Sequence, residues 1–227
     1  MTIAFDTTTN VAAGTGNLSW THTPVGTPRG ILVLIVQDIT AADQITSVTY
    51  GGVALSAVAG SPLLHTNGSE DGAIYGYFLG SSIPTGNQTV DITVSAGAAK
   101  RAVCYSVTAA ANTEIEDTTA DDTGTVANPS VNVTLASGVS AFVAGVLHSG
   151  QNSPTFVAEI ANTTLVLEYD FGSACGVWSR RTNIETGAGD FAIGWTATSD
   201  ESAILAVAIK ESAASTWIPK IYMITEG

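Results

Sequence analysis

The carboxylates between Glu114 and Asp122 are the residues of this chain whose types and spacing come nearest to a cation site. They are Glu114, Glu116, Asp117, Asp121 and Asp122. Calcium takes several carboxylate and carbonyl oxygens from a flexible loop, often with a glycine nearby, and Gly124 follows the group. The spacing departs from the Asp-x-Asp-x-Asp-Gly loop that a glutamate closes. We therefore expect a solvated acidic segment here, and we keep Asp117, Asp121 and Asp122 as calcium candidates.

The histidines show no spacing that would bind a metal. His22, His65 and His148 are far apart, and none belongs to a His-x-x-x-His or Glu-x-x-His pattern. A Ser-His-Asp triad can assemble from distant residues, but no Gly-x-Ser-x-Gly elbow supports one here. We expect His22, which alternates with Trp20, to pack on that ring, and His148 to close a buried strand.

The remaining carboxylates and aromatic residues raise the question of carbohydrate chemistry. A glycosidase needs two carboxylates on either side of a sugar, and no spacing pairs Glu168, Asp170, Glu185 and Asp190. A sugar platform and core packing are both open readings of Tyr75, Tyr77, Trp178 and Trp195, and their recurrence at matching points of the two halves favours the core. No glycine-rich turn between a strand and a helix is present to hold phosphate. We predict a protein that is not an enzyme, with no catalytic residues and no cofactor.

The elements that must position these residues all read as strands. Apolar and polar residues alternate over 18–22, 90–95 and 131–136, which places one face in a core and one in water. The apolar runs Ile31–Val36 and Ile204–Ile209 are typical of central strands covered on both faces. Gly, Pro and Asn turns separate the strands, and no helix longer than two turns is indicated. The chain is predicted to be all-β, a jelly-roll-like β-sandwich.

The second half of the sequence repeats the strand pattern of the first. Residues 30–36 align with 141–147, 86–93 with 189–196, and 101–107 with 202–208. We predict one duplicated sandwich over 1–212, with half-repeats at about 15–110 and 129–212 and a surface crossover at 111–128. Two separate domains joined by 111–128 are the alternative, since the length of 227 residues allows either.

The C-terminal residues 213–227 have no counterpart in the first half and are predicted to form an arm. The arm either covers an edge of its own sheet or docks on a neighbouring subunit, as strand addition often does. Its candidate partner-binding residues are Trp217, Ile218, Pro219, Ile221, Tyr222 and Met223.

Composition limits the partners. The net charge of −13 repels nucleic acid and anionic membranes and favours a partner with a basic face or divalent cations. No apolar run approaches the length of a membrane span, and the N-terminus does not resemble a secretory signal, so we expect synthesis in a cytosol. Cys104 and Cys175 lie in apolar strands and are expected to be buried free thiols, with one bridge as the alternative.

Three segments resemble the jelly-roll-like β-sandwich structural proteins of tailed bacteriophages. They are Ser47–Leu55, with Thr49-Tyr50-Gly51-Gly52, the aromatic strand Ile74–Leu79, and Ile83–Val94, with Pro84-Thr85-Gly86-Asn87. The resemblance implies a non-enzymatic virion protein, a capsid decoration or auxiliary (cement) protein that forms a homo-oligomer such as a trimer and contacts the major capsid protein. A tail or fibre module, or a carbohydrate- or receptor-binding module, is the alternative.

Overall fold

The structure is a computed structural model that describes residues 3–38, 41–66, 71–150, 162–196 and 200–213. In these ranges every regular element is a β-strand, and the strand pairings are antiparallel. The predicted all-β sandwich architecture is confirmed. The strands are β1 (Ala4–Asn10), β2 (Leu18–His22), β3 (Gly30–Asp38), β4 (Ile45–Tyr50), β5 (Val53–Ala54), β6 (Ser56–Ala57), β7 (Leu63–His65), β8 (Gly72–Leu79), β9 (Gln88–Val94), β10 (Lys100–Thr108), β11 (Thr113–Val126), β12 (Ser130–Leu135), β13 (Ser140–Ser149), β14 (Thr163–Asp170), β15 (Cys175–Arg181), β16 (Glu185–Thr186), β17 (Gly189–Gly194) and β18 (Asp200–Glu211).

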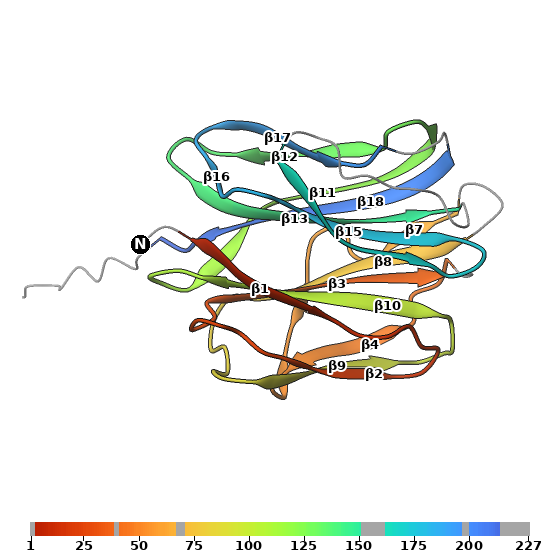
Figure 1. Ribbon diagram of the computed structural model, residues 1–227, viewed down its shortest axis with the longest axis horizontal. Helices are drawn as coiled ribbons and strands as arrows, with labels where there is room; N and C mark the ends of the chain where they lie inside the picture. The colour runs from red at the N-terminus through yellow and green to blue at the C-terminus, as the bar shows by residue number, and fades with distance from the viewer. Residues whose placement is uncertain (1–2, 39–40, 67–70, 151–161, 197–199, 214–227) are drawn as a thin grey trace, which may run out of the picture.

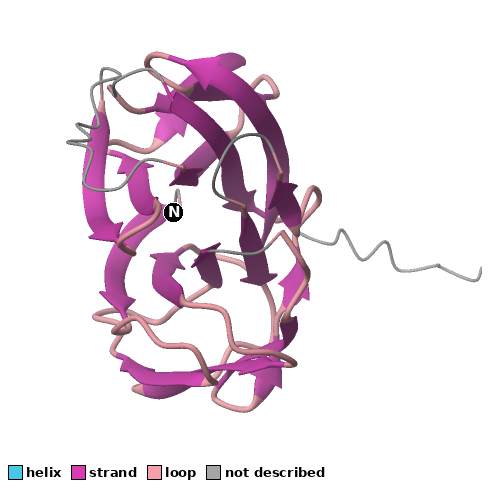
Figure 2. Cartoon of the chain, turned by 90° about the vertical axis from the view of Figure 1, so that its right-hand side faces the viewer, coloured by secondary structure: helices cyan, strands magenta, loops and turns pink. Residues whose placement is uncertain are grey.

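The strands form four stacked layers, visible from bottom to top in Figure 1. The first outer sheet has the order β2-β9-β4-β5, and the first inner sheet has β1-β10-β3-β8-β6, with β7 also on β8. The second inner sheet has β11-β18-β13-β15-β14, with β16 on β13, and the second outer sheet is β12-β17. Figure 2 shows the stack from the side, with strand and loop in all described parts.

The central strands of both inner sheets are covered on both faces, as the apolar runs predict. Every residue of Ile31–Val36 and of Ile204–Ile209 has an exposed fraction of 0%. On the outer-sheet strands β2, β9 and β12 the burial alternates, and in β12 Val131, Val133 and Leu135 point inward. The pattern of apolar and polar residues therefore indicates whether a strand lies in an inner or an outer sheet.

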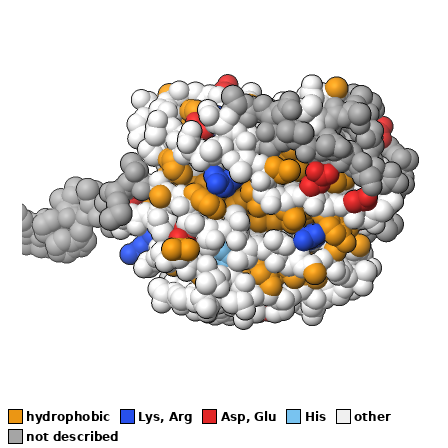
Figure 3. All heavy atoms as spheres, viewed as in Figure 1, with side chains coloured by type: hydrophobic (Ala, Val, Ile, Leu, Met, Phe, Trp, Pro, Cys, Tyr) orange, Lys and Arg blue, Asp and Glu red, His pale blue; other side chains and the backbone are white. Residues whose placement is uncertain are grey.

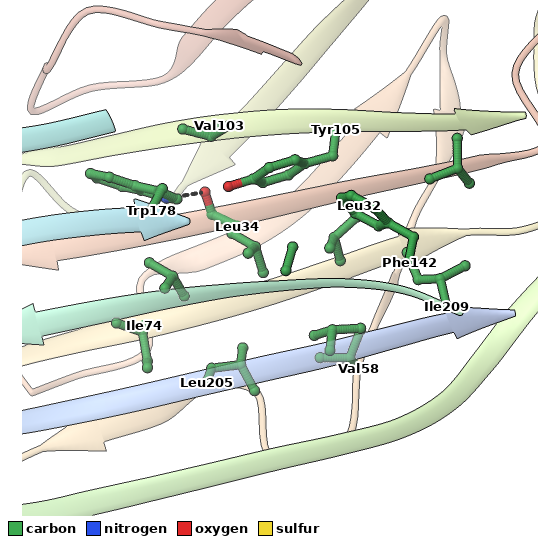
Figure 4. Close-up of a cluster of buried hydrophobic side chains, with 14 of the residues drawn as sticks. Leu32, Leu34, Val58, Ile74, Val103, Tyr105, Phe142, Trp178, Leu205 and Ile209 are labelled. Atoms are coloured by element: carbon green, nitrogen blue, oxygen red, sulfur yellow. Dashed lines mark hydrogen bonds between the residues drawn. The ribbon is translucent and has the colours of Figure 1, made fainter. Parts of the chain in front are cut away.

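A central core joins the two inner sheets, and Figure 4 shows its side chains. Leu32, Leu34 and Tyr105 come from the first inner sheet and meet Phe142, Trp178 and Leu205 from the second. The indole Nε1 of Trp178 donates a hydrogen bond to the carbonyl oxygen of Leu34 at 2.9 Å. Two further cores are present, one between each inner sheet and its outer sheet.

The inner sheets share their order of pairing: β1-β10-β3-β8 in the first and β11-β18-β13-β15 in the second. The strands aligned in sequence, β3 with β13 and β10 with β18, hold the same places in that order. The two inner sheets therefore have similar topology. Duplication of the sequence stays a prediction, and so does the organisation as one domain or two.

The expected surface crossover at 111–128 is wrong, because most of it is the long edge strand β11. It pairs with β18 from Thr113↔Glu211 to Val126↔Asp200, with register shifts between Ile115 and Asp117 and between Thr123 and Val126. Only the short stretch 109–112 separates β10 from β11. The two halves are therefore joined by a tight connection.

Candidate functional site

The acidic residues of β11 do not converge on a cation. Asp117 accepts a hydrogen bond from the Thr134 backbone N–H at 2.6 Å, and Glu116 lies 2.5 Å from the Lys210 ammonium. Asp122 lies instead beside His65. Since a strand sends successive side chains to opposite faces, β11 spreads the carboxylates that a calcium loop would gather. Nowhere in the described ranges do three His, Cys, Asp or Glu side chains stand close enough to hold a metal ion.

The packing of the two halves creates a buried polar group that the sequence did not suggest, the histidine–aspartate cluster of Asp38, His65, Asp122 and His148. The His65 and His148 rings are fully buried, with centroids 5.1 Å apart. His65 Nδ1 lies 2.5 Å from an Asp122 oxygen, and His148 Nε2 lies 3.8 Å from an Asp38 oxygen. Each of these pairs joins a residue of the first half to a residue of the second.

The geometry of the cluster favours a structural role. Ser173 Oγ donates to Asp38 at 2.8 Å, so this serine bonds the carboxylate, whereas a triad serine bonds the imidazole. His65, His148 and Asp38 are all 0% exposed, and the Asp122 side chain is 22% exposed. The cluster supplies polar contacts across the seam between the two halves, and such contacts fix how two surfaces register.

His22, the last residue of β2 in the first outer sheet, belongs to a second buried polar group. The Thr9 hydroxyl accepts from Trp20 Nε1 at 3.0 Å and lies 2.8 Å from His22 Nδ1, so the expected contact between His22 and Trp20 runs through Thr9. The imidazole lies edge-on to Tyr50, with centroids 6.0 Å apart. Burial lowers the pKa of His22 to about 4, against a smaller opposing effect of Asp6. The ring is therefore neutral at ordinary pH.

The aromatic residues considered for a sugar platform belong to the cores. Tyr75 and Trp178 are 0% exposed and Trp195 is 1% exposed, while Tyr77 is half-buried. Two of the carboxylates considered with them have other partners: Glu185 pairs with Arg181 at 2.6 Å, and Asp190 accepts from Thr134 Oγ1 at 2.7 Å.

The thiols are free and buried, as expected. Burial raises the pKa of Cys175 to about 12 and raises that of Cys104 still further, so neither forms a thiolate near neutral pH.

The central core reaches the surface along one side, where β1 and β14 are the edge strands of the two inner sheets. We call the half-buried residues there, Phe5, Arg101, Tyr169, Phe171 and Arg180, the aromatic–arginine band. Arg180 stacks on Phe5 with its Cζ 4.0 Å from the ring centroid, and Arg101 stacks on Tyr169 at 4.4 Å. Figure 3 shows hydrophobic side chains along the middle of this face with basic side chains among them.

An open hollow of about 520 Å³ lies where the described chain ends. Ile3 and Val139 contribute to its apolar lining, and Ala213 lies at its margin. Its charged residues are Glu114, Lys210 and Glu211. The predicted partner-binding residues Trp217, Ile218, Pro219, Ile221, Tyr222 and Met223 lie outside the described residues.

Comparison with known proteins identifies no relative of this chain, so a function must be argued from its fold and its residues. No protein-family model, no curated protein and no solved structure matches the chain. The described part contains no helix with the length and apolarity that a membrane crossing requires.

Proposed function

We propose that this protein is a non-enzymatic structural protein of a tailed-phage virion that decorates the capsid as a homo-oligomer. It is synthesised in the host cytoplasm, and its partners are further copies of itself and the major capsid protein. The C-terminal arm clasps a neighbour, and the folded body bridges adjacent subunits. Nucleic acid, membranes and cofactors have no part in this role.

The observation that supports the proposal best is the double burial of both inner sheets. Because β3, β13 and β18 contact apolar layers on each face, the body is a solid block of close-packed sheets. Close-packed interiors have low compressibility and transmit strain, which suits a part that holds a shell together. The acidic surface, with a net charge of −13, suits a partner with a basic face.

The test is the solution mass of the full-length chain, measured by light scattering after size exclusion. We expect a discrete trimer or larger closed oligomer, and a chain that ends at Ser212 is expected to be monomeric with an unchanged circular dichroism spectrum. A truncated chain that still assembles would remove the arm from the proposal. A full-length chain that stays monomeric at every concentration would remove the homo-oligomer.

The alternative is a tail, fibre or receptor-binding module that recognises carbohydrate. The aromatic–arginine band favours it, since half-buried rings such as Tyr169 and Phe171 can stack on sugars. Calorimetric titration with a broad glycan panel separates the two functions. Saturable heat with one glycan class would favour the alternative, and no heat across the panel would count against it.

A further inference from the structure

We infer that the aromatic–arginine band is the surface on which a second copy of this chain docks, through its C-terminal segment Trp217–Ile224. The inference rests on the proposed assembly and names the two surfaces that would meet in it. The band belongs to the folded body, and the segment belongs to the neighbouring copy.

The band has the composition of an interface centre. Arginine and aromatic residues are enriched among the few residues that carry most of the binding free energy where proteins meet. Phe5 stacks on the buried Phe142 at 5.7 Å between centroids, and Tyr169 meets Phe171 edge-on at 4.9 Å. These contacts hold the rings in place before any partner arrives, which lowers the entropic cost of binding.

The positive charge of the band also favours the approach of another copy of this acidic chain. Among the described ion pairs, Lys210 is paired with Glu114 and Glu116, and Arg181 with Glu185. Arg101 and Arg180 take part in none of these pairs: Arg101 Nε donates to the Val11 carbonyl oxygen at 3.1 Å, and Arg180 Nη1 donates to that of Arg181 at 2.9 Å. Copies that each carry −13 repel one another, and two cations on one side reduce that repulsion locally.

The C-terminal segment fits the band in apolar character and in reach. Trp217, Ile218 and Ile221–Ile224 are apolar or aromatic, with Lys220 among them. Glu226 follows the segment with a charge opposite to that of the arginines. Residues 214–227 span at most about 50 Å when extended, and a folded chain of this size has a radius of gyration of about 17 Å. The segment can therefore cross to an adjacent body, where β1 and β14 offer sheet edges beside the band.

Disulfide trapping between two full-length chains tests the contact. One chain carries Leu165→Cys on β14, and the other carries Met223→Cys and a mass tag. The control replaces Leu64 on β7, at the edge of the first inner sheet opposite β1, because Leu64 and Leu165 are 37% and 38% exposed. Cys104 and Cys175 are buried and do not compete. After mild oxidation we expect at least about fivefold more mixed dimer with Leu165→Cys than with Leu64→Cys.

Equal yields from the two sites would overturn the inference, and if the solution mass still showed an oligomer, the proposed assembly would stand without it. A chain with both Leu165→Cys and Met223→Cys tests the competing occupant, the segment of the same chain. Loss of free thiols in that chain without covalent dimers would also overturn the inference.

The arginines provide a second readout. In the Leu165→Cys chain, Arg101→Gln with Arg180→Gln is expected to lower the trapping yield at least about fivefold, while Arg29→Gln, a control at an arginine that is not part of the band, leaves it unchanged. Near-ultraviolet circular dichroism confirms that the variants are folded. An unchanged yield in the folded double variant would contradict the role of the two cations.

Discussion

At the scale of single residues, His22 makes the stability of the fold depend on pH. Its pKa falls from the usual 6.5 to about 4 because burial penalises the charged imidazole. Between these values the unfolded chain binds a proton that the folded chain does not. The contribution of the neutral ring is therefore complete above pH 6.5 and is lost as the pH falls toward 4.

His22→Gln is expected to flatten this dependence. The shift corresponds to at most about 3 kcal/mol of unfolding free energy lost between pH 7 and pH 4 in the native protein. The variant loses less over the same range, because glutamine does not titrate, although it is less stable at pH 7. Urea unfolding at pH 7, 5.5 and 4.5 gives both slopes. Parallel slopes for the two proteins would show that His22 is not the group responsible.

At the scale of elements, the close approach of β8 to β13 depends on a glycine. A Cβ added to Gly72 would overlap the His148 ring, whereas one added to Gly16 meets nothing within 4 Å. Gly72→Ala is expected to destabilise the protein by about 1–3 kcal/mol, because the ring must move within a packed seam. Gly16→Ala is the control and is expected to be near neutral. Denaturant unfolding of Gly72→Ala with and without His148→Ala measures the coupling, and additive free energies would contradict the clash.

The sequence predicted those strands in which the pattern of apolar and polar side chains matches the burial of the strand. Ile31–Val36 lies between two apolar layers and Val131–Leu135 between a core and water, so the local pattern is sufficient. β11 was missed because its carboxylates are satisfied by distant groups: Glu116 accepts from the Ala136 N–H and pairs with Lys210. The histidine–aspartate cluster was missed for a related reason, because it exists only when the halves pack.

At the scale of the whole molecule, the central core makes the two halves depend on each other. Leu34, Tyr105 and Ile74 on one side and Phe142, Trp178 and Leu205 on the other are at most 1% exposed. Separating the halves would expose these side chains and leave the Trp178 N–H without the Leu34 carbonyl. Each inner sheet packs on the other inner sheet with one face and on its own outer sheet with the other face. A cavity in either outer core therefore destabilises an inner sheet on which the other half packs.

We therefore expect one cooperative thermal transition in calorimetry. Ile92→Ala in β9 and Ile193→Ala in β17 probe the first and second outer cores, and each residue is at most 1% exposed. Each cavity is expected to cost about 2–5 kcal/mol and to lower the Tm of the single transition by roughly 5–15 °C. Independent domains would instead give two transitions, with each variant moving only one of them. Such a result would show that the central core is a weak interface between two domains, and it would favour the two-domain alternative.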